Sequence, residues 1–289
     1  MNRAADCVLV SVVRDFPMYE KLVRDNPNNR GVVFHPCDNT VENKTITERY
    51  NAFLDSWDYA KEAWFIFLHE DFEFLEPPER ILAGLDAGAI YGALGLDFSR
   101  AIRGLVLQCE RGGGRLRFGG RPLHSPELVS TTDCCCMIVH SSLVARYNLR
   151  FDVNLSFDFY TEDFEMDAHE RFGIKTFVAP MRACHWSYGS FGKRFFVLRN
   201  YLLKKYSSAK SVYFTTTFQA VGPLAPVAAA RRRSVCGRIK RRLLRLFWRK
   251  RYGKTGWFVI TVLGLPVYAW RYANLKEWLN ARARVDLAR

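Results

Sequence analysis

One stretch decides the fold: Trp64-Phe65-Ile66-Phe67-Leu68-His69-Glu70-Asp71. Five apolar residues are followed at once by a histidine and two acids. A short, fully apolar run predicts a strand buried on both faces, as in an α/β sheet. Open α/β sheets bind ligands at the carboxyl ends of their strands, and carboxylates there suit hard cations. The alternative is an ordinary strand end followed by a solvated acidic turn.

Strands and helices alternate before this stretch. Val8–Val13 and Val32–Phe34 are short apolar runs that predict strands, and Tyr19–Arg24 between them suits a short helix. Thr45–Trp57 carries apolar residues at helical spacing behind a threonine that can cap a helix. Together with the strand at 64–68, this alternation predicts a parallel sheet with right-handed crossovers. The elements predicted downstream are strands at 90–96, 134–139, 176–178 and 184–186, a hairpin of 105–110 with 115–118, and helices at 163–171 and 191–205.

Charge is distributed unevenly along the 289 residues. Residues 231–289 hold 17 of the 43 Lys and Arg residues but only two of the 29 acidic residues, a net charge of +15. Residues 1–230 are therefore almost neutral, with a net charge of −1. This balance argues against residues 1–230 binding nucleic acid over a broad surface. We predict an α/β domain at 1–218, a Pro/Gly/Ala-rich linker at 219–230 and a basic segment at 231–289.

The eight cysteines form no Cys-x-x-Cys pair and have no spacing to histidine that suits zinc. Cys134, Cys135 and Cys136 are consecutive, and neighbouring strand residues point to opposite faces, so we interpret them as small apolar core residues. The first residues of the chain contain no apolar stretch long enough for a signal peptide. Together these features predict a reducing, cytoplasmic location.

Polar residues stand where several predicted strands end. They are Asp38, the Glu70/Asp71 pair, the Glu162/Asp163 pair and His185. An α/β sheet gathers such ends into one crevice. Carboxylates and a histidine in that crevice could hold a divalent cation and leave one carboxylate as a general base. A cation bound to a diphosphate would neutralise the charge on a departing nucleotide, which is what sugar transfer from a nucleotide donor requires.

The ordered set of motifs resembles family 2 glycosyltransferases of the GT-A fold, most closely the streptomycin-biosynthesis-type glycosyltransferase domain. The resemblance covers roughly residues 7–205. The matching segments are Asp38, Arg49-Tyr50-Asn51, His69-Glu70-Asp71, Leu149-Arg150-Phe151-Asp152, Phe159 to Met166, Phe172-Gly173-Ile174-Lys175 and Cys184 to Ser190. The resemblance implies a Rossmann-like, mostly parallel sheet with helices on both faces, and hexosyl or other glycosyl transfer as the activity.

The resemblance also implies how the nucleotide sugar is bound. Asp38 would hydrogen-bond the base or ribose, and Arg49 and Asn51 would lie beside the donor pocket. Glu70 would be a secondary contact of the same pocket. Two of these residues also have a purely structural alternative, since Asp38 can end a strand in an Asx turn and Asn51 can be a core or capping residue.

For the chemistry, the resemblance assigns Asp71 to the last position of the Asp-x-Asp metal motif, where it would bind Mg²⁺ or Mn²⁺ through the diphosphate. His69 stands at the first position in place of an acid, so fewer protein oxygens would hold the cation. His185 would lie near the diphosphate or ligate the metal. Asp163, with Glu162 beside it, would be the base of a single inverting displacement. The alternatives are a helix N-terminal charge pair for the two acids and a core histidine for His185.

The C-terminal segment predicts association with a membrane surface. Residues 231–254 contain twelve Lys or Arg residues and no acid, interleaved with leucines and aromatics. A basic amphipathic helix of this kind lies well on an anionic membrane. The apolar stretch at 257–270 is too short, and too broken by Gly264 and Pro266, for a membrane-spanning helix. The alternatives are a solvated basic tail or an RNA contact.

These predictions combine into one hypothesis, an inverting, metal-dependent glycosyltransferase. It would move sugar from a nucleotide-sugar donor to a glycan or lipid-linked acceptor on the cytoplasmic face of a membrane, held there peripherally through residues 231–270. A metal-dependent hydrolase or nucleotidyltransferase is the rival enzyme. The alternative that is not an enzyme is a catalytically inactive binding module with the GT-A fold.

Overall fold

The structure is a computed structural model, and it describes residues 6–109, 115–186, 192–217 and 219–223, with only the backbone at 115–119. The described residues fall within one compact unit, Met1–Pro223. The predicted basic segment at 231–289 and its membrane contact at 231–270 lie outside them and stay predictions.

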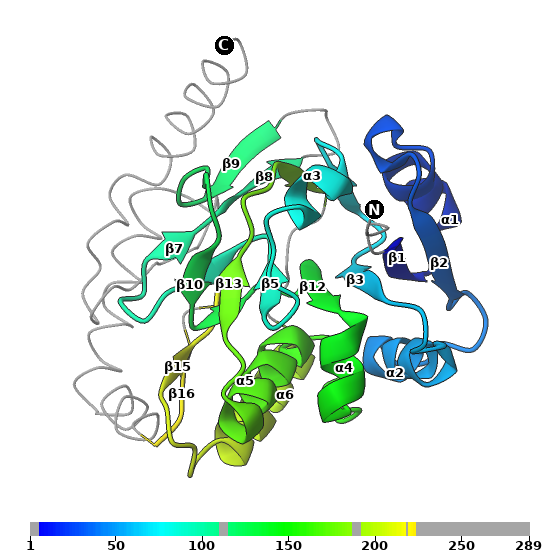
Figure 1. The fold of residues 1–289 in the computed structure, drawn as a ribbon. Coiled ribbons are helices and arrows are strands. Elements are labelled where there is room, and N and C mark those ends of the chain that lie inside the picture. Colours follow the sequence, from blue (N-terminus) through cyan, green and yellow to red (C-terminus); the bar gives the residue numbers. More distant parts are fainter. Residues whose placement is uncertain (1–5, 110–114, 187–191, 218, 224–289) are drawn as a thin grey trace, which may run out of the picture. The chain divides into compact units, whose positions relative to one another are not determined.

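A seven-stranded sheet forms the centre of the fold (Figure 1). Its strands, in spatial order, are β10 (Glu127–Val129), β13 (Thr176–Val178), β5 (Ile90–Gly92), β12 (Cys136–His140), β3 (Ala63–Leu68), β1 (Asp6–Val13) and β2 (Val33–Asp38). Pairing is parallel along β2, β1 and β3 and between β5 and β13. Strand β12 is antiparallel to β3 and β5, and β10 is antiparallel to β13. Five of the seven strands therefore run in one direction.

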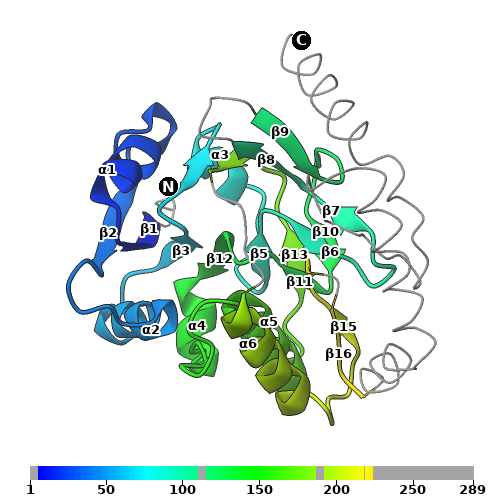
Figure 2. The same ribbon diagram turned by 180° about the vertical axis from the view of Figure 1, so that it is seen from behind.

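Both faces of the sheet are covered because the side chains of β3 alternate between two cores. Phe65 and Phe67 pack in the core shared with helices α2 (Ile46–Ser56), α4 (Ser141–Tyr147), α5 (Tyr160–Phe172) and α6 (Lys193–Lys205). Ile66 and Leu68 pack in the other core, beneath α1 (Phe16–Tyr19) and α3 (Pro78–Leu82). The two views of the ribbon show these two groups of helices on opposite sides of the sheet (Figures 1 and 2). The predicted fold class, α/β with a Rossmann-like, mostly parallel sheet and helices on both faces, is confirmed.

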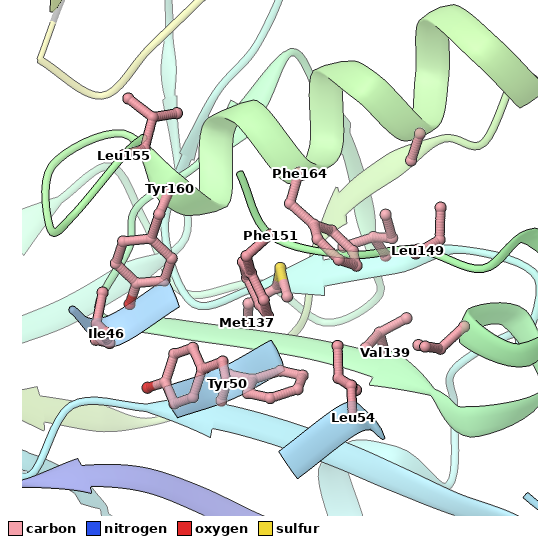
Figure 3. Close-up of a cluster of buried hydrophobic side chains, with 14 of the residues drawn as sticks. Ile46, Tyr50, Leu54, Met137, Val139, Leu149, Phe151, Leu155, Tyr160 and Phe164 are labelled. Carbon is pink, nitrogen blue, oxygen red and sulfur yellow. The ribbon is translucent and has the colours of Figure 1, made fainter. Parts of the chain in front are cut away.

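Aromatic rings fill the first of these cores (Figure 3). Tyr50 on α2 lies with its ring centroid 5.4 Å from Phe151 and 6.0 Å from Tyr160. Phe151 in turn lies 4.7 Å from Phe164 on α5. Such tilted pairs add to the free energy of burial. They fix the start of α5 against α2, close to the end of β3.

The predicted helix ends are largely those observed. Thr45 is the N-cap of α2, and with Glu48 it forms a capping box that satisfies donors of the first turn. Helix α5 begins at Tyr160 rather than at 163, and it ends at Gly173, whose φ of +70° is the left-handed conformation that glycine adopts at low cost. The glycine turn in the predicted motif is therefore a helix C-cap.

Smaller sheets complete the described unit. A four-stranded sheet has the order β4 (Phe72–Phe74), β14 (Ala183–His185), β8 (Leu105–Cys109) and β9 (Arg115–Gly119). The remaining strands form a three-stranded sheet of β11 (Thr131–Thr132), β6 (Gly95–Leu96) and β7 (Ile102–Arg103), and a pair of β15 (Tyr213–Phe214) and β16 (Ala220–Val221). The remaining helical turns are a π-helical turn at Glu20–Arg24 and a 3₁₀ turn at Pro27–Asn29. The hairpin predicted from 105 to 118 is the β8–β9 pair, whereas the single strand predicted at 90–96 is divided between β5 and β6.

The cysteines differ in part from the prediction. Cys109 and Cys184 form a disulfide bond between β8 and β14, 75 residues apart in sequence. Cys134, Cys135 and Cys136 are free thiols, and the last two are fully buried, as small core residues would be. Burial raises the pKa of all three thiols. Because one pair is bonded, the cysteine pattern no longer supports the predicted reducing location.

No helix in the described ranges has the length and apolarity needed to cross a bilayer.

Candidate functional site

Two strand ends bring three predicted polar residues together. His69 and Asp71 follow β3, and His185 is the last residue of β14. Strand β14 pairs antiparallel with β4, which begins directly after Asp71, so that His185 lies opposite Phe72. The backbone N–H of Trp186 donates to the carbonyl of Asp71 at 3.0 Å. The ladder between β4 and β14 therefore places His185 beside Asp71, and the turn that links β3 to β4 adds His69.

The cluster has the composition of a metal site. His185 Nε2 lies 3.2 Å from Asp71 Oδ1, and His69 Nδ1 lies 4.0 Å from the same oxygen. One ligand atom from each of the three residues can be chosen so that all lie within 4.8 Å of one another. Two imidazoles and one carboxylate suit a transition-metal cation such as Mn²⁺ better than Mg²⁺, which prefers oxygen ligands. The residues present therefore fit a divalent cation.

The pKa values of the two histidines are shifted in opposite directions. Burial lowers the pKa of His69 to about 4 although the charge of Asp71 opposes it, so the ring is neutral at pH 7. Burial also lowers the pKa of His185, but its hydrogen bond to Asp71 and the charge of that carboxylate outweigh this and raise the pKa overall. Metal binding needs both rings unprotonated. His69 meets that condition at neutral pH.

His69 is a member of the site that the sequence analysis treated as a departure from the motif. Residues 69–71 are not extended but form a turn between β3 and β4, which the Phe72 N–H closes by donating to the carbonyl of His69 at 3.1 Å. This turn, rather than the alternation of side chains along a strand, places the imidazole of His69 beside Asp71.

Asp133 is a second residue of this region that carries no recognisable motif in the sequence. It directly follows β11, and its carboxylate accepts hydrogen bonds from the backbone N–H of Cys135 at 3.1 Å and from Thr216 Oγ1 at 3.0 Å. Its negative charge acts to raise the pKa of His69 and of His185. Asp133 is therefore a carboxylate close to the metal cluster. An acid after a short Thr-Thr strand was the only signal in the sequence.

The two acids at the start of α5 have different surroundings. Glu162 is 3% exposed, and burial, together with the charge of Asp133, raises its pKa well above the usual value. Asp163 is 1% exposed and faces α6. Lys205 Nζ lies 2.7 Å from its Oδ1, and the Tyr206 hydroxyl donates to the same oxygen at 3.0 Å. Burial raises the pKa of Asp163 to about 6 although Lys205 opposes it. The described contacts of Asp163 are thus with α6 and not with the metal cluster.

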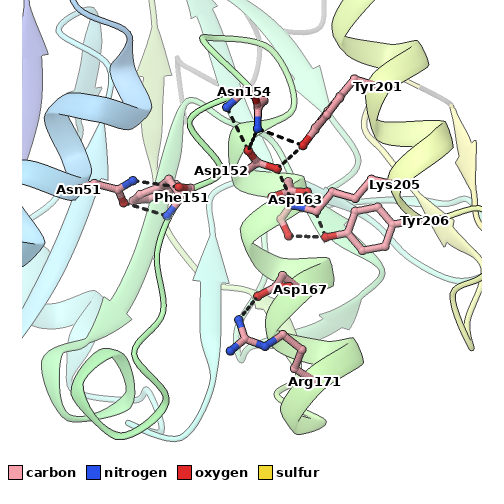
Figure 4. A network of polar contacts seen from close by, with 10 residues as sticks. All are labelled: Asn51, Phe151, Asp152, Asn154, Asp163, Asp167, Arg171, Tyr201, Lys205 and Tyr206. Carbon is pink, nitrogen blue, oxygen red and sulfur yellow. Dashed lines mark hydrogen bonds and ion pairs between the residues drawn. The ribbon is translucent and has the colours of Figure 1, made fainter.

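Asp163 belongs to a polar network that joins α5, α6 and the loop before α5 (Figure 4). Lys205 Nζ also lies 2.7 Å from Asp152 Oδ2. Tyr201 donates to that oxygen at 2.8 Å, and Asn154 donates to the other carboxylate oxygen from its backbone N–H and its side-chain amide, at 3.0 and 2.8 Å. These bonds lower the pKa of Asp152 to about 2 despite its partial burial. One ammonium group therefore balances two carboxylates.

The predicted donor contacts are mostly engaged within the chain. Glu70 Oε2 accepts from the backbone N–H groups of Arg14 and Asp15 at 2.6 and 2.8 Å. Asp38 is exposed, and its Oδ1 accepts from the backbone N–H and hydroxyl of Thr40 at 2.9 and 2.7 Å. These bonds lower the pKa of Asp38. Asp38 thus forms the Asx turn considered as an alternative, and its contact with a nucleotide stays a prediction.

Arg49 and Asn51 on α2 hold neighbouring segments in place. Arg49 Nε donates to Asn39 Oδ1 at 3.2 Å, next to Asp38. The amide of Asn51 pairs with the backbone of Phe151 in both directions, at 2.9 Å each way. Asn51 therefore ties α2 to the segment before α5, which is the structural role considered for it.

Comparison with known proteins gives matches to solved structures at low sequence identity. No family model matches the chain, and no curated protein matches it. The solved structures that resemble it include, at 10% identity each, GalNAc-T7 with UDP, GalNAc and Mn²⁺ (TM-score 0.44, 65% of this chain, 45% of that chain), S. aureus TarS 1–349 (0.44, 72% and 66%) and S. aureus TarS (0.38, 72% and 40%). This chain spans less than half of the first and third and 66% of the second. Similarity at this level carries neither a ligand nor an activity over to this chain.

Proposed function

We propose that this chain is a metal-dependent, inverting glycosyltransferase of the GT-A fold. It moves a sugar from a nucleotide-sugar donor to a glycan or lipid-linked acceptor. The observation that carries the proposal is the cluster of His69, Asp71 and His185 at the edge of an α/β sheet where such folds bind ligands. The cluster occurs within the ordered motifs that resemble this family.

The three cluster residues would hold a divalent cation, with Mn²⁺ favoured over Mg²⁺ by the two imidazoles. When bound, the cation supplies positive charge that stabilises a leaving nucleoside diphosphate. Asp71 provides the one negative ligand and keeps His185 oriented through their 3.2 Å contact. Asp38 and Arg49, with Glu70 behind the β1–α1 turn, border the nucleotide. Asn51 acts on this pocket only through α2.

The acceptor hydroxyl must lose a proton as it attacks the anomeric carbon. The resemblance assigns this role to Asp163, and a pKa of about 6 supports it because such a group is ionised at neutral pH and close to the operating range. Lys205 must swing away before an acceptor can reach Asp163, and its side chain is 28% exposed. Glu162 is the second candidate, supported by its proximity to Asp133. Loss of the base costs about 10²–10⁴ in rate, so Asp163→Asn and Glu162→Gln separate the two.

The activity test uses the full chain, a panel of nucleotide sugars and Mn²⁺. We expect release of a nucleoside diphosphate from one donor, and we expect Asp71→Asn to abolish it. Asp58→Asn, a substitution at an exposed acid with no place in the cluster, serves as the matched control. The proposal is abandoned if no donor reacts or raises the melting temperature and Asp71→Asn changes nothing.

The same experiment separates the rivals. A nucleoside monophosphate, or a product carrying one, would indicate a hydrolase or nucleotidyltransferase. Donor binding without turnover in the presence of acceptor extracts would indicate an inactive binding module. Retention of anomeric configuration in the product, measured by NMR, would contradict the inverting mechanism.

The place of action remains part of the proposal. We propose peripheral attachment to an anionic membrane surface through residues 231–270, on the basis of their charge and aromatic content. Co-sedimentation with anionic liposomes, comparing the full chain with residues 1–230, tests this. Equal binding by the two forms would refute the assignment to the C-terminal segment.

A further inference from the structure

Tyr160 lies between the metal cluster and the protein core. It is the first residue of α5, and its side chain is completely buried (Figure 3). Its hydroxyl donates to the carbonyl of Cys134 at 2.6 Å and lies 3.2 Å from Nε2 of His69. The hydroxyl thus contacts the one ring nitrogen of His69 that does not face Asp71.

The direction of these two hydrogen bonds follows from the number of protons available. A tyrosine hydroxyl has a single hydrogen, and a carbonyl oxygen can only accept. The short bond to Cys134 therefore uses that hydrogen. The hydroxyl oxygen can then only accept from His69, which requires the imidazole proton to be on Nε2. In the neutral ring, the lone pair is left on Nδ1, which faces Asp71 at 4.0 Å.

We infer that Tyr160 is a positioning residue that fixes His69 as the Nε2–H tautomer and so presents Nδ1 to the metal. The inference rests on the metal site of the proposed function. In metal sites, the hydrogen bond at one ring nitrogen generally sets which nitrogen binds the metal. Here that partner is a phenol held by a backbone carbonyl, on a different element from the ligand it orients.

Other contacts hold the ring of His69 in the orientation that this requires. The backbone N–H of His69 donates to the carbonyl of Cys135 at 3.1 Å, next to the carbonyl that Tyr160 uses. The ring of Phe157 stacks on the imidazole with centroids 5.6 Å apart and an interplanar angle of 23°. His185, in contrast, directs Nε2 toward Asp71. The two histidines therefore offer different ring nitrogens to the cation, which spectroscopy can distinguish.

The test combines the tautomer with metal affinity. Long-range ¹H–¹⁵N NMR of the metal-free full chain should show His69 as the Nε2–H tautomer, with mixed tautomers in Tyr160→Phe. Titration of Mn²⁺ followed by electron paramagnetic resonance should give a Kd about 10- to 100-fold weaker for Tyr160→Phe than for the wild type. Tyr91→Phe is the control, because Tyr91 is also buried and its hydroxyl bonds only to the backbone of Asp86 among the described contacts. It should keep the wild-type Kd.

The inference is overturned if wild-type His69 carries its proton on Nδ1, or if Tyr160→Phe binds Mn²⁺ as tightly as Tyr91→Phe. The NMR result on the wild type decides the tautomer even if Tyr160→Phe does not fold. A wild-type chain that takes up no Mn²⁺ would refute the metal site of the proposed function. That outcome differs from one in which the wild type and Tyr160→Phe bind Mn²⁺ with the same Kd. The second result would refute only the role of Tyr160.

Discussion

Replacement of Lys205 by methionine tests the balance of charge between α5 and α6. The ammonium group lies 2.7 Å from Asp163 and 2.7 Å from Asp152, and no second cation contacts either acid among the described ion pairs. Removal of one partner of a buried ion pair costs about 3–5 kcal/mol. Water reaches part of Lys205, so we expect the lower end, a loss of about 3 kcal/mol in the free energy of unfolding at pH 7.5.

The loss should depend on pH in a direction that the structure specifies. Burial already raises the pKa of Asp163 to about 6, above the value of 3.8 for an unburied group, and Lys205 opposes that rise. Without Lys205 the pKa rises further. A carboxyl group with a raised folded-state pKa gains stability as pH falls through that pKa. Protonation of Asp163 should therefore recover about 1 kcal/mol or more of the loss at pH 5.5. Asp152 should stay ionised, since it keeps its bonds to Tyr201 and Asn154.

Urea denaturation followed by tryptophan fluorescence at pH 7.5 and 5.5 measures both effects. Lys204→Met, at the exposed preceding residue of the same helix, should change stability by less than about 0.5 kcal/mol. Lys205→Arg should retain most of the stability because it keeps the charge. The reasoning fails if Lys205→Met costs no more than Lys204→Met, or if its cost is the same at both pH values.

Three further predictions concern other groups. Binding of Mn²⁺ should strengthen as pH rises through the raised pKa of His185, since proton and cation compete for Nε2; equal Kd values at pH 6 and pH 8 by calorimetry would contradict this. Cys109→Ser combined with Cys184→Ser should cost about 2–4 kcal/mol, because the bond links residues 75 apart, and an unchanged urea midpoint would count against it. Glu165, which accepts hydrogen bonds from Thr132, has its pKa raised to about 8 by burial. Glu165→Gln should therefore be nearly neutral at pH 7, and only the wild type should lose stability from pH 7 to pH 9; parallel pH curves would exclude this.

The sheet could be predicted from the sequence because its signals are local. Residues 64–68 are apolar without interruption, and this reflects a central strand buried on both faces. A threonine before the apolar stripe indicated the start of α2, and Thr45 is the observed N-cap. The division of the predicted strand at 90–96 was not visible, because it depends on which partners each half finds. Ile90–Gly92 pairs with β12 and β13, whereas Gly95–Leu96 pairs with β11 and β7.

The site was predictable only in part, because several of its residues are positioned by contacts that are distant in sequence. Asp71 and His185 were identified from motifs, and the structure brings them to 3.2 Å. Asp133 has no motif, and its position depends on tertiary contacts such as the bond from its backbone N–H to the carbonyl of Leu94. Asn51 was expected beside the donor, but its partner is a backbone segment 100 residues away. Contacts of this range leave no periodic trace in a sequence.

The two hydrogen bonds that Glu70 accepts from the backbone after β1 limit where a phosphate can bind. Its carboxylate occupies the backbone N–H groups of Arg14 and Asp15, which open the first turn after β1. In many nucleotide-binding α/β proteins, the amides at that turn receive the phosphate directly. Here the chain supplies its own anion to them, and an incoming diphosphate finds those donors already engaged. Positive charge for the diphosphate then has to come from other groups, such as the cation proposed at His69, Asp71 and His185, so the affinity of the proposed enzyme for a nucleotide should rise with the concentration of that cation.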